Sequence, residues 1–174
     1  LSGENPLIIL GVSCDYWLLF ARRAGSAGRE GTVALMVDRQ ARGVTVESMP
    51  ATMGVRGTDH AHLTFDRTPV PLDNRLGEEG QGLEVALGGF LTPSRISVAM
   101  SCVGLARRAQ ELAVEHARTR ETFGKPLVAR QAIAFMLAEN ATEIEAARQL
   151  TLHAARHWEA GDPSASTLSS MAKL

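Results

Sequence analysis

The chain has 174 residues, a formal net charge of −1, 45% hydrophobic residues and 21% charged residues. This balance is typical of a globular protein, and it argues against a basic surface for nucleic acid or an anionic membrane. The longest apolar runs are too short to span a bilayer. Cys14 and Cys102 have no metal-ligand spacing and fit a reducing compartment, so we expect a cytoplasmic protein. Because residue 1 is not methionine and helical spacing continues to Leu174, we also expect a piece of a longer protein.

The first half of the chain has the signals of short β-strands. Four segments are apolar or alternate with period two, and turns rich in glycine separate them. These segments are residues 17–21, 32–37, 44–49 and 62–65. Pro69 and Pro71 should end the last strand, because proline cannot donate to a β-ladder. Consecutive strands without intervening helices predict a barrel or a sandwich.

The second half has apolar residues at helical spacing. One series runs from Ile96 to Ala113 and another from Ile133 to Leu150. Breaks are predicted near Phe123 and at Gly161, and the Asp-Pro pair after Gly161 predicts the cap of a third helix. We therefore expect an α+β protein, with a β-domain in residues 1–82 and antiparallel helices in residues 83–174.

Three short motifs have ordinary structural explanations, which we favour for the first two and leave open for the third. The glycines of residues 77–82 are in the wrong order for a dinucleotide-binding turn, so we expect a turn that leads into a helix. His153 and His157 have a spacing that can hold a metal, but no third ligand is near in sequence, and a solvated helix face is favoured. Ser94 and Arg95 begin a long helix, where either a capped first turn or a ligand site is possible.

The strongest constellation lies between the two long helices, in residues 120–127. It places an arginine, a hydroxyl and an aromatic ring together as Arg120, Thr122 and Phe123. A guanidinium can bind a phosphate through two hydrogen bonds, a threonine hydroxyl can bind another oxygen, and phenylalanine can pack on a flat ring. The residues alone also allow a simple helix–helix connection with an exposed arginine.

This segment resembles the acyl-CoA dehydrogenase family, which has R-x-T-F-G-x-x-[LI]-x-x-x-Q-x-[IV] at this junction. The matching residues here are Arg120, Thr122, Phe123, Gly124, Leu127, Gln131 and Ile133. Further matches extend over nearly the whole chain: residues 53–59, 63–65, 70–71, 76–77, 80–82, 95–96, 104–106 and 171–173, and a turn at residues 2–4.

The resemblance implies a flavoenzyme that removes two hydrogens from an acyl-CoA thioester. Residues 1–82 would be the end of a middle β-barrel, and residues 83–174 the start of a C-terminal four-helix bundle. Arg120 and Thr122 would bind the pyrophosphate of FAD held mainly by a neighbouring subunit. Phe123, Leu127, Gln131 and Ile133 would line the adenosine side. Ser94 and Arg95 are assigned to substrate binding.

Two departures from the family pattern bear on activity. The family's usual catalytic glutamate lies outside residues 1–174, and the alternative glutamate position is Ser94, so no catalytic base is expected in this chain. The family's W-I-[ST] after the first turn, which shields the flavin and bonds near N5, is matched by Leu7, Ile8 and Ile9. Neither the aromatic ring nor the hydroxyl is present there.

Two functions follow from the resemblance. The first is an FAD-dependent acyl-CoA dehydrogenase, with electron-transfer flavoprotein as the electron acceptor and a homodimer or homotetramer as the assembly. The second is a non-catalytic subunit that completes a partner's FAD site in a heteromeric acyl-CoA dehydrogenase. Acyl-CoA oxidases and flavin monooxygenases share the scaffold and are a smaller possibility.

Overall fold

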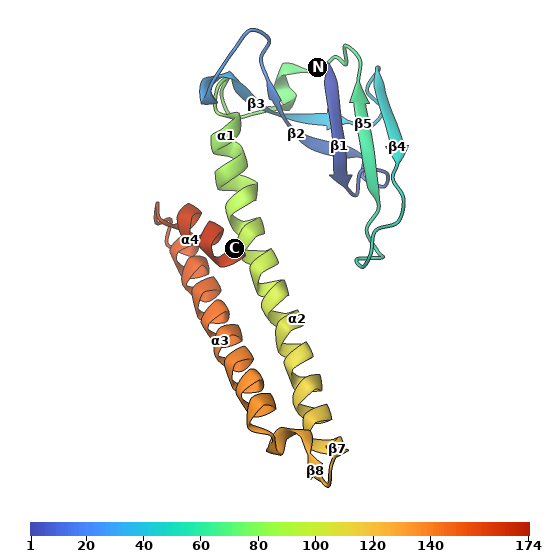
Figure 1. The fold of residues 1–174 in the computed structure, drawn as a ribbon. Coiled ribbons are helices and arrows are strands. Elements are labelled where there is room, and N and C mark those ends of the chain that lie inside the picture. Colours follow the sequence, from blue (N-terminus) through green and yellow to red (C-terminus); the bar gives the residue numbers. More distant parts are fainter. The chain divides into compact units, whose positions relative to one another are not determined.

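The computed structural model describes residues 1–174, which divide into two compact units, Leu1–Ala86 and Leu87–Leu174 (Figure 1). The first unit is mostly β and the second is mostly helical, so the expected α+β class is confirmed. The expected domain boundary between residues 82 and 83 stays a prediction.

The β-unit consists of two three-stranded antiparallel sheets and not of a closed barrel. The order is β1-β5-β4 in one sheet and β2-β3-β6 in the other. The strands are β1 (Gly3–Ile9), β2 (Tyr16–Arg22), β3 (Thr32–Asp38), β4 (Val44–Ser48), β5 (His60–Phe65) and β6 (Arg75–Leu76). All four strands expected from the sequence are therefore present. Strands β1 and β6 were not predicted, and two of the residues expected as a turn, Gly3 and Glu4, are instead the first residues of β1.

The core of the β-unit is formed by residues from both sheets. Strand β5 alternates perfectly, so Ala61, Leu63 and Phe65 are buried while the residues between them are half-exposed. From the other sheet Trp17 of β2 reaches this cluster, and its ring meets the ring of Phe65 edge to face with centroids 6.4 Å apart. The period-two pattern thus buries large apolar side chains on one face of each sheet.

Strand β1 lies at the edge of its sheet, which explains how it contains Pro6. It pairs only with β5, and its register shifts between Asn5 and Ile8. A proline is tolerated at such a place because it interrupts no ladder on a second side. Ile8 packs against the core, while Leu7 and Ile9 point outward and are 56% and 64% exposed.

The helical unit has two long helices joined by a small hairpin. These elements are α2 (Thr92–Thr119), the strands β7 (Glu121–Thr122) and β8 (Lys125–Pro126), and α3 (Gln131–Glu159). Short helix α4 (Ala165–Lys173) packs against both α2 and α3. Before α2, helix α1 (Gly82–Val85) is followed by a π-helical segment over Ala86–Leu91. Helical structure from Leu83 onward and the break near Phe123 are confirmed, as Figure 1 shows.

Helix α3 ends at Glu159, and the break after it depends on Gly161, which adopts the left-handed backbone conformation. Gly161 has φ +68°, its N–H donates to the carbonyl of Trp158, and the N–H of Asp162 donates to the carbonyl of His157. This pair of hydrogen bonds is the Schellman arrangement that ends many helices. The Asp162 carboxylate then accepts the N–H of Ser164 at 2.8 Å, just before α4 begins. None of these helices combines the length and the hydropathy that a membrane-spanning helix needs.

Candidate functional site

The candidate site is the hairpin between α2 and α3. Helix α2 ends at Thr119, and Arg120 leaves it in an extended conformation with φ −77° and ψ 121°. Glu121 pairs with Pro126 and Thr122 with Lys125, so only Phe123 and Gly124 form the turn. The N–H of Leu127 donates to the carbonyl of Arg120 at 2.9 Å and closes the hairpin. The loop is therefore fixed by backbone hydrogen bonds on both sides.

The turn requires positive φ at both of its residues. Phe123 has φ +53° and Gly124 has φ +72°, the pattern of a type I′ turn. Glycine adopts this conformation freely, but a bulky residue there costs roughly 1–2 kcal/mol. The Phe123 ring is also 97% exposed, although burial of such a ring stabilises most proteins. Strain and exposure at the same residue point to a contact with a ligand or a partner.

The polar groups of the hairpin can bind an anion with phosphate chemistry. The Arg120 side chain is exposed and has no hydrogen-bond partner in the protein, so its guanidinium is free to bind two oxygens at once. Thr122 is half-buried and its hydroxyl can donate one hydrogen bond. These residues and the exposed Phe123 ring all lie on this one hairpin, and their chemistry suits a phosphate group attached to a flat ring.

The structure adds Arg130, which the sequence had not indicated. One terminal nitrogen of its guanidinium, Nη2, lies 2.6 Å from the carbonyl oxygen of Thr122 and 2.8 Å from the Thr122 Oγ1. The same guanidinium lies 5.5 Å from the centroid of the Phe123 ring. No sequence pattern predicts this contact, because it arises only when the hairpin folds back toward the start of α3.

The other residues expected near the flavin lie just beyond the hairpin. Leu127 is half-buried in a single 3-10 turn, Gln131 is exposed as the first residue of α3, and Ile133 is half-buried. The fold thus brings them to the same connection as Arg120 and Thr122. Their assignment to the adenosine side stays a prediction.

Ser94 and Arg95 lie in the first turn of α2, at the opposite end from the hairpin. A helix rises about 1.5 Å per residue, so roughly 36 Å separates Arg95 from the hairpin end. Both residues are half-buried, and the Arg95 side chain has no hydrogen bond or ion pair. The structure does not bring them together with the hairpin, and their role in substrate binding stays a prediction.

The outward face of β1 does not supply what the family pattern places there. Leu7 and Ile9 project from it as aliphatic side chains, with neither a ring to stack nor a hydroxyl to donate. The next residue, Leu10, has φ +57°, which is unusual for a residue with a branched side chain. The hairpin therefore fits a phosphate ligand, whereas this part of β1 does not fit a polar contact to a flavin ring.

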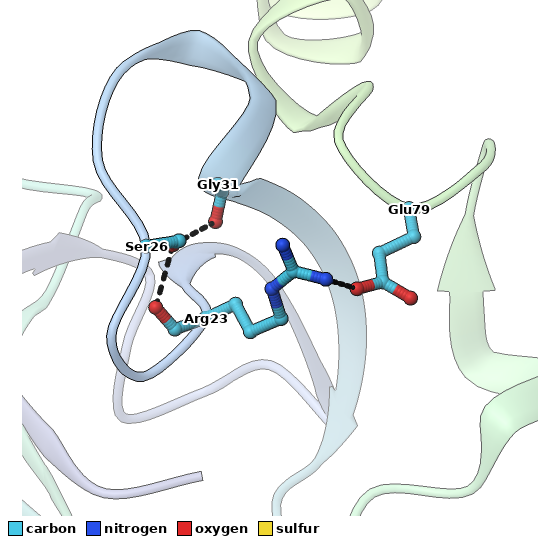
Figure 2. A network of polar contacts seen from close by, with 4 residues as sticks. All are labelled: Arg23, Ser26, Gly31 and Glu79. Atoms are coloured by element: carbon cyan, nitrogen blue, oxygen red, sulfur yellow. Dashed lines mark hydrogen bonds and ion pairs between the residues drawn. The ribbon is translucent and has the colours of Figure 1, made fainter.

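The glycine-rich segment of residues 77–82 is a turn that leads into helix α1, as expected. A Cβ atom on Gly82 would lie only 2.5 Å from the Val33 nitrogen, so glycine is needed where α1 crosses β3. Figure 2 shows a contact between this segment and the residue that follows β2, where Glu79 forms an ion pair with Arg23. The Ser26 hydroxyl donates to the Arg23 carbonyl at 2.6 Å. The polar side chains of Arg23, Ser26 and Glu79 thus make contacts within the β-unit.

His153 and His157 face each other on α3 with ring centroids 4.3 Å apart. His157 Nδ1 lies 3.0 Å from the Ser164 hydroxyl and 3.2 Å from an Asp162 carboxylate oxygen. No group of three or more histidine, cysteine, aspartate or glutamate side chains is placed to hold a metal ion. These polar contacts link the end of α3 to the turn that precedes α4.

The two units correspond to two known domains that follow one another in the same order. Residues 1–68 match the acyl-CoA dehydrogenase middle domain, and residues 80–174 match the acyl-CoA dehydrogenase C-terminal domain. The chain belongs to the acyl-CoA dehydrogenase family. Members of this family are flavoprotein oxidoreductases of acyl-CoA metabolism.

Individual relatives agree with this assignment. An acyl-CoA dehydrogenase of Bacillus subtilis is 39% identical over 155 residues, which are 89% of this chain and 41% of the relative. A subunit of the caffeyl-CoA reductase-Etf complex of Acetobacterium woodii is 35% identical over 155 residues, again 89% of this chain and 41% of the relative. The solved butyryl-CoA dehydrogenase of Megasphaera elsdenii superposes with a TM-score of 0.88 at 34% identity, over 98% of this chain and 44% of that one. The chain thus spans about two fifths of the length of these relatives.

Proposed function

We propose that this chain is part of an FAD-dependent acyl-CoA dehydrogenase that removes the α- and β-hydrogens of an acyl-CoA thioester. The observation that carries the proposal is the hairpin, on which an unpaired Arg120, the Thr122 hydroxyl and an exposed Phe123 ring all lie. The family assignment names the flavoenzyme class that such a hairpin would serve.

In this proposal the hairpin binds the diphosphate of FAD held mainly by a neighbouring subunit. Arg120 donates two charge-assisted hydrogen bonds to the phosphate oxygens, and Thr122 donates one from its hydroxyl. Phe123 packs on the flat adenine side and keeps water from these bonds. When bound, FAD would accept the β-hydrogen as a hydride, while a general base from outside residues 1–174 takes the α-proton.

The test is flavin retention by full-length protein that carries Arg120→Ala. Hydrogen bonds to charged groups contribute roughly 1.5–3 kcal/mol each, so the dissociation constant of FAD should rise by about tenfold or more. Arg120→Lys should restore only part of the affinity, because an ammonium group cannot bind two oxygens in one plane. Arg156→Ala, an exposed position on α3 away from the hairpin, is the matched control and should change little. Unchanged binding by Arg120→Ala would remove the hairpin from the FAD site.

A second function is favoured by one observation, the aliphatic face of Leu7 and Ile9 on β1. In that case the chain is a non-catalytic subunit that lends Arg120 and Thr122 to the FAD of a different subunit and holds no flavin ring itself. The flavin content of the purified full-length protein distinguishes the two. One FAD per subunit supports the enzyme, while no FAD in the protein alone and recovery with a partner chain supports the second function.

The remaining partners follow from the proposed reaction. Electrons would pass to electron-transfer flavoprotein, in agreement with the Etf complex to which one relative belongs. A diphosphate shared between subunits requires at least a dimer, and we expect a homodimer or homotetramer of the full-length protein. Light scattering at micromolar concentration tests this, and a monomer would contradict it. The cytoplasmic location stays a prediction.

A further inference from the structure

The contact between Arg130 and Thr122 restricts what the Thr122 hydroxyl can do. A guanidinium only donates hydrogen bonds, so the Thr122 Oγ1 must accept at the 2.8 Å contact with Arg130. A hydroxyl has one proton to donate, and in this structure no protein group accepts it from Thr122. The proton is therefore available to a group that accepts hydrogen bonds.

The same arginine also holds the backbone of the turn. Its Nη2 donates to the Thr122 carbonyl at 2.6 Å, directly before the strained Phe123. Its guanidinium lies 5.5 Å from the Phe123 ring centroid, within the range of a cation–π contact. Arg130 thus contacts the residue that would donate to a ligand and the residue that would pack on it.

We propose that Arg130 is a positioning residue, which orients the Thr122 hydroxyl so that its proton is directed toward an acceptor-only anion, the diphosphate of FAD. The inference rests on the proposed FAD function. Diphosphate oxygens can only accept hydrogen bonds, so they match a hydroxyl that accepts from Arg130 and still has its proton to donate. Arg130 acts through Thr122 and Phe123, in contrast to Arg120, whose own guanidinium is free.

A double-mutant cycle tests this on full-length apoprotein, with FAD binding followed by flavin fluorescence. Arg130→Met should raise the dissociation constant of FAD about fivefold, since it removes charge-assisted hydrogen bonds that orient the donor. In a Thr122→Val background, which has no hydroxyl to orient, the same change should have an effect of less than about twofold. Arg130→Lys should recover part of the affinity, because an ammonium can still donate to Oγ1.

Two controls separate positioning from charge and from unfolding. Arg118→Met removes an exposed arginine from the last turn of α2 that has no hydrogen bond to the hairpin, so it controls for net charge and should leave FAD binding within about twofold. Hydrogen exchange of the Leu127 amide, which donates to the Arg120 carbonyl, reports whether the hairpin is still closed in each variant.

The outcomes are distinct. Wild-type affinity in Arg130→Met overturns the inference, and so does a fivefold loss that persists in the Thr122→Val background, because Arg130 would then act without the hydroxyl. An opened hairpin in both Arg130→Met and Arg130→Lys also overturns it in favour of a structural role. If Arg120→Ala and Thr122→Val both bind FAD like wild type, the proposed function itself fails, and this inference fails with it.

Discussion

The β-unit and the helical unit bury different kinds of side chain. In the β-unit, large apolar residues from two sheets meet in one core, with Trp17, Leu63 and Phe65 at its centre. In the helical unit, the fully buried positions on α3 and α4 are small residues, Thr151, Ala154, Ala165 and Ser169. Large apolar residues of α2 and α3 are instead exposed: Leu105, Leu112, Phe135 and Met136.

The difference lies in which side chains form the core of each unit, because both units also expose large apolar residues, such as Phe20 in the β-unit and Leu105 on α2. In the β-unit the two sheets contribute large apolar side chains to one core, while Leu7, Ile9 and Phe20 stay exposed. Two long helices and one short helix can cover only one side of each other, and they approach closely because the residues between them are small. The exposed apolar side chains on the helices are those that additional helices or subunits would cover, in agreement with the proposed bundle.

The largest expected effect comes from the β-unit core. Leu63→Ala removes a fully buried side chain and should lower the free energy of unfolding by about 2–5 kcal/mol. Leu105→Ala on α2, where the side chain is 74% exposed, is the matched substitution and should cost less than about 0.5 kcal/mol in the dissociated protein. Urea unfolding gives both values. Equal losses would show that both positions contribute alike to folding, whereas a loss at Leu105 only in the assembled protein would show that a neighbouring subunit covers it.

Overpacking between the helices should have the next largest effect. Ala154 of α3 is fully buried, so Ala154→Leu must separate helices that now lie in close contact and should destabilise the protein by about 1–3 kcal/mol. Ala146→Leu, at an exposed position on the same helix, is the control. Thermal and urea unfolding measure both. If Ala154→Leu is neutral, the close approach of the helices does not depend on small residues.

A smaller change of opposite sign is expected at the hairpin. Phe123→Asn creates an Asn-Gly turn, the pair best suited to a type I′ hairpin, and should stabilise the hairpin by roughly 0.5–1 kcal/mol. Slower hydrogen exchange of the Leu127 amide would show this. The same substitution removes the exposed ring and should weaken FAD binding. A gain in stability without a loss of FAD affinity would mean that the strained phenylalanine has no role in binding.

Much of this fold could be predicted from the sequence, because its strongest signals are local. An apolar run marked β2, β-branched residues marked β3, and period two marked β4 and β5. Helical spacing marked both long helices, and turn residues marked the breaks at Phe123 and Gly161. Strand β1 was missed because Pro6 and a register shift interrupt its alternation, and β6 is only two residues long. Two separate sheets could not be distinguished from part of a barrel, because pairing between distant strands has no local signal.

The residues of the candidate site also differ in whether the sequence alone could indicate them. Arg120, Thr122 and Phe123 stand together in the sequence, so a motif indicated them. Arg130 makes its contacts across an eight-residue interval that is neither a helix turn nor a strand period, and only the folded hairpin reveals them. The positive φ of Phe123 was equally hidden, since phenylalanine is rarely found in that conformation.

The smallest effect is expected from pH, at the corner between α3 and α4. The Ser164 hydroxyl and N–H, and then the nearby His157 ring, lower the pKa of Asp162 below its ordinary value of 3.8. A carboxyl whose pKa is lower in the folded state stabilises the fold fully above its unfolded pKa, and this stabilisation is lost as the pH falls through the folded value. Lowering the pH below about 4 should therefore loosen the start of α4. In the β-unit, hydrogen bonds from the Ser13 hydroxyl and the Val12 N–H lower the pKa of Asp59 in the same way, so these contacts should weaken over the same pH range. Hydrogen exchange of the Ser164 and Leu168 amides as a function of pH, corrected for intrinsic rates, measures the loosening at α4. Asp162→Asn keeps an oxygen that can accept the Ser164 N–H but does not titrate, so it should abolish the pH dependence. If the dependence persists in that variant, another carboxyl controls the corner between α3 and α4.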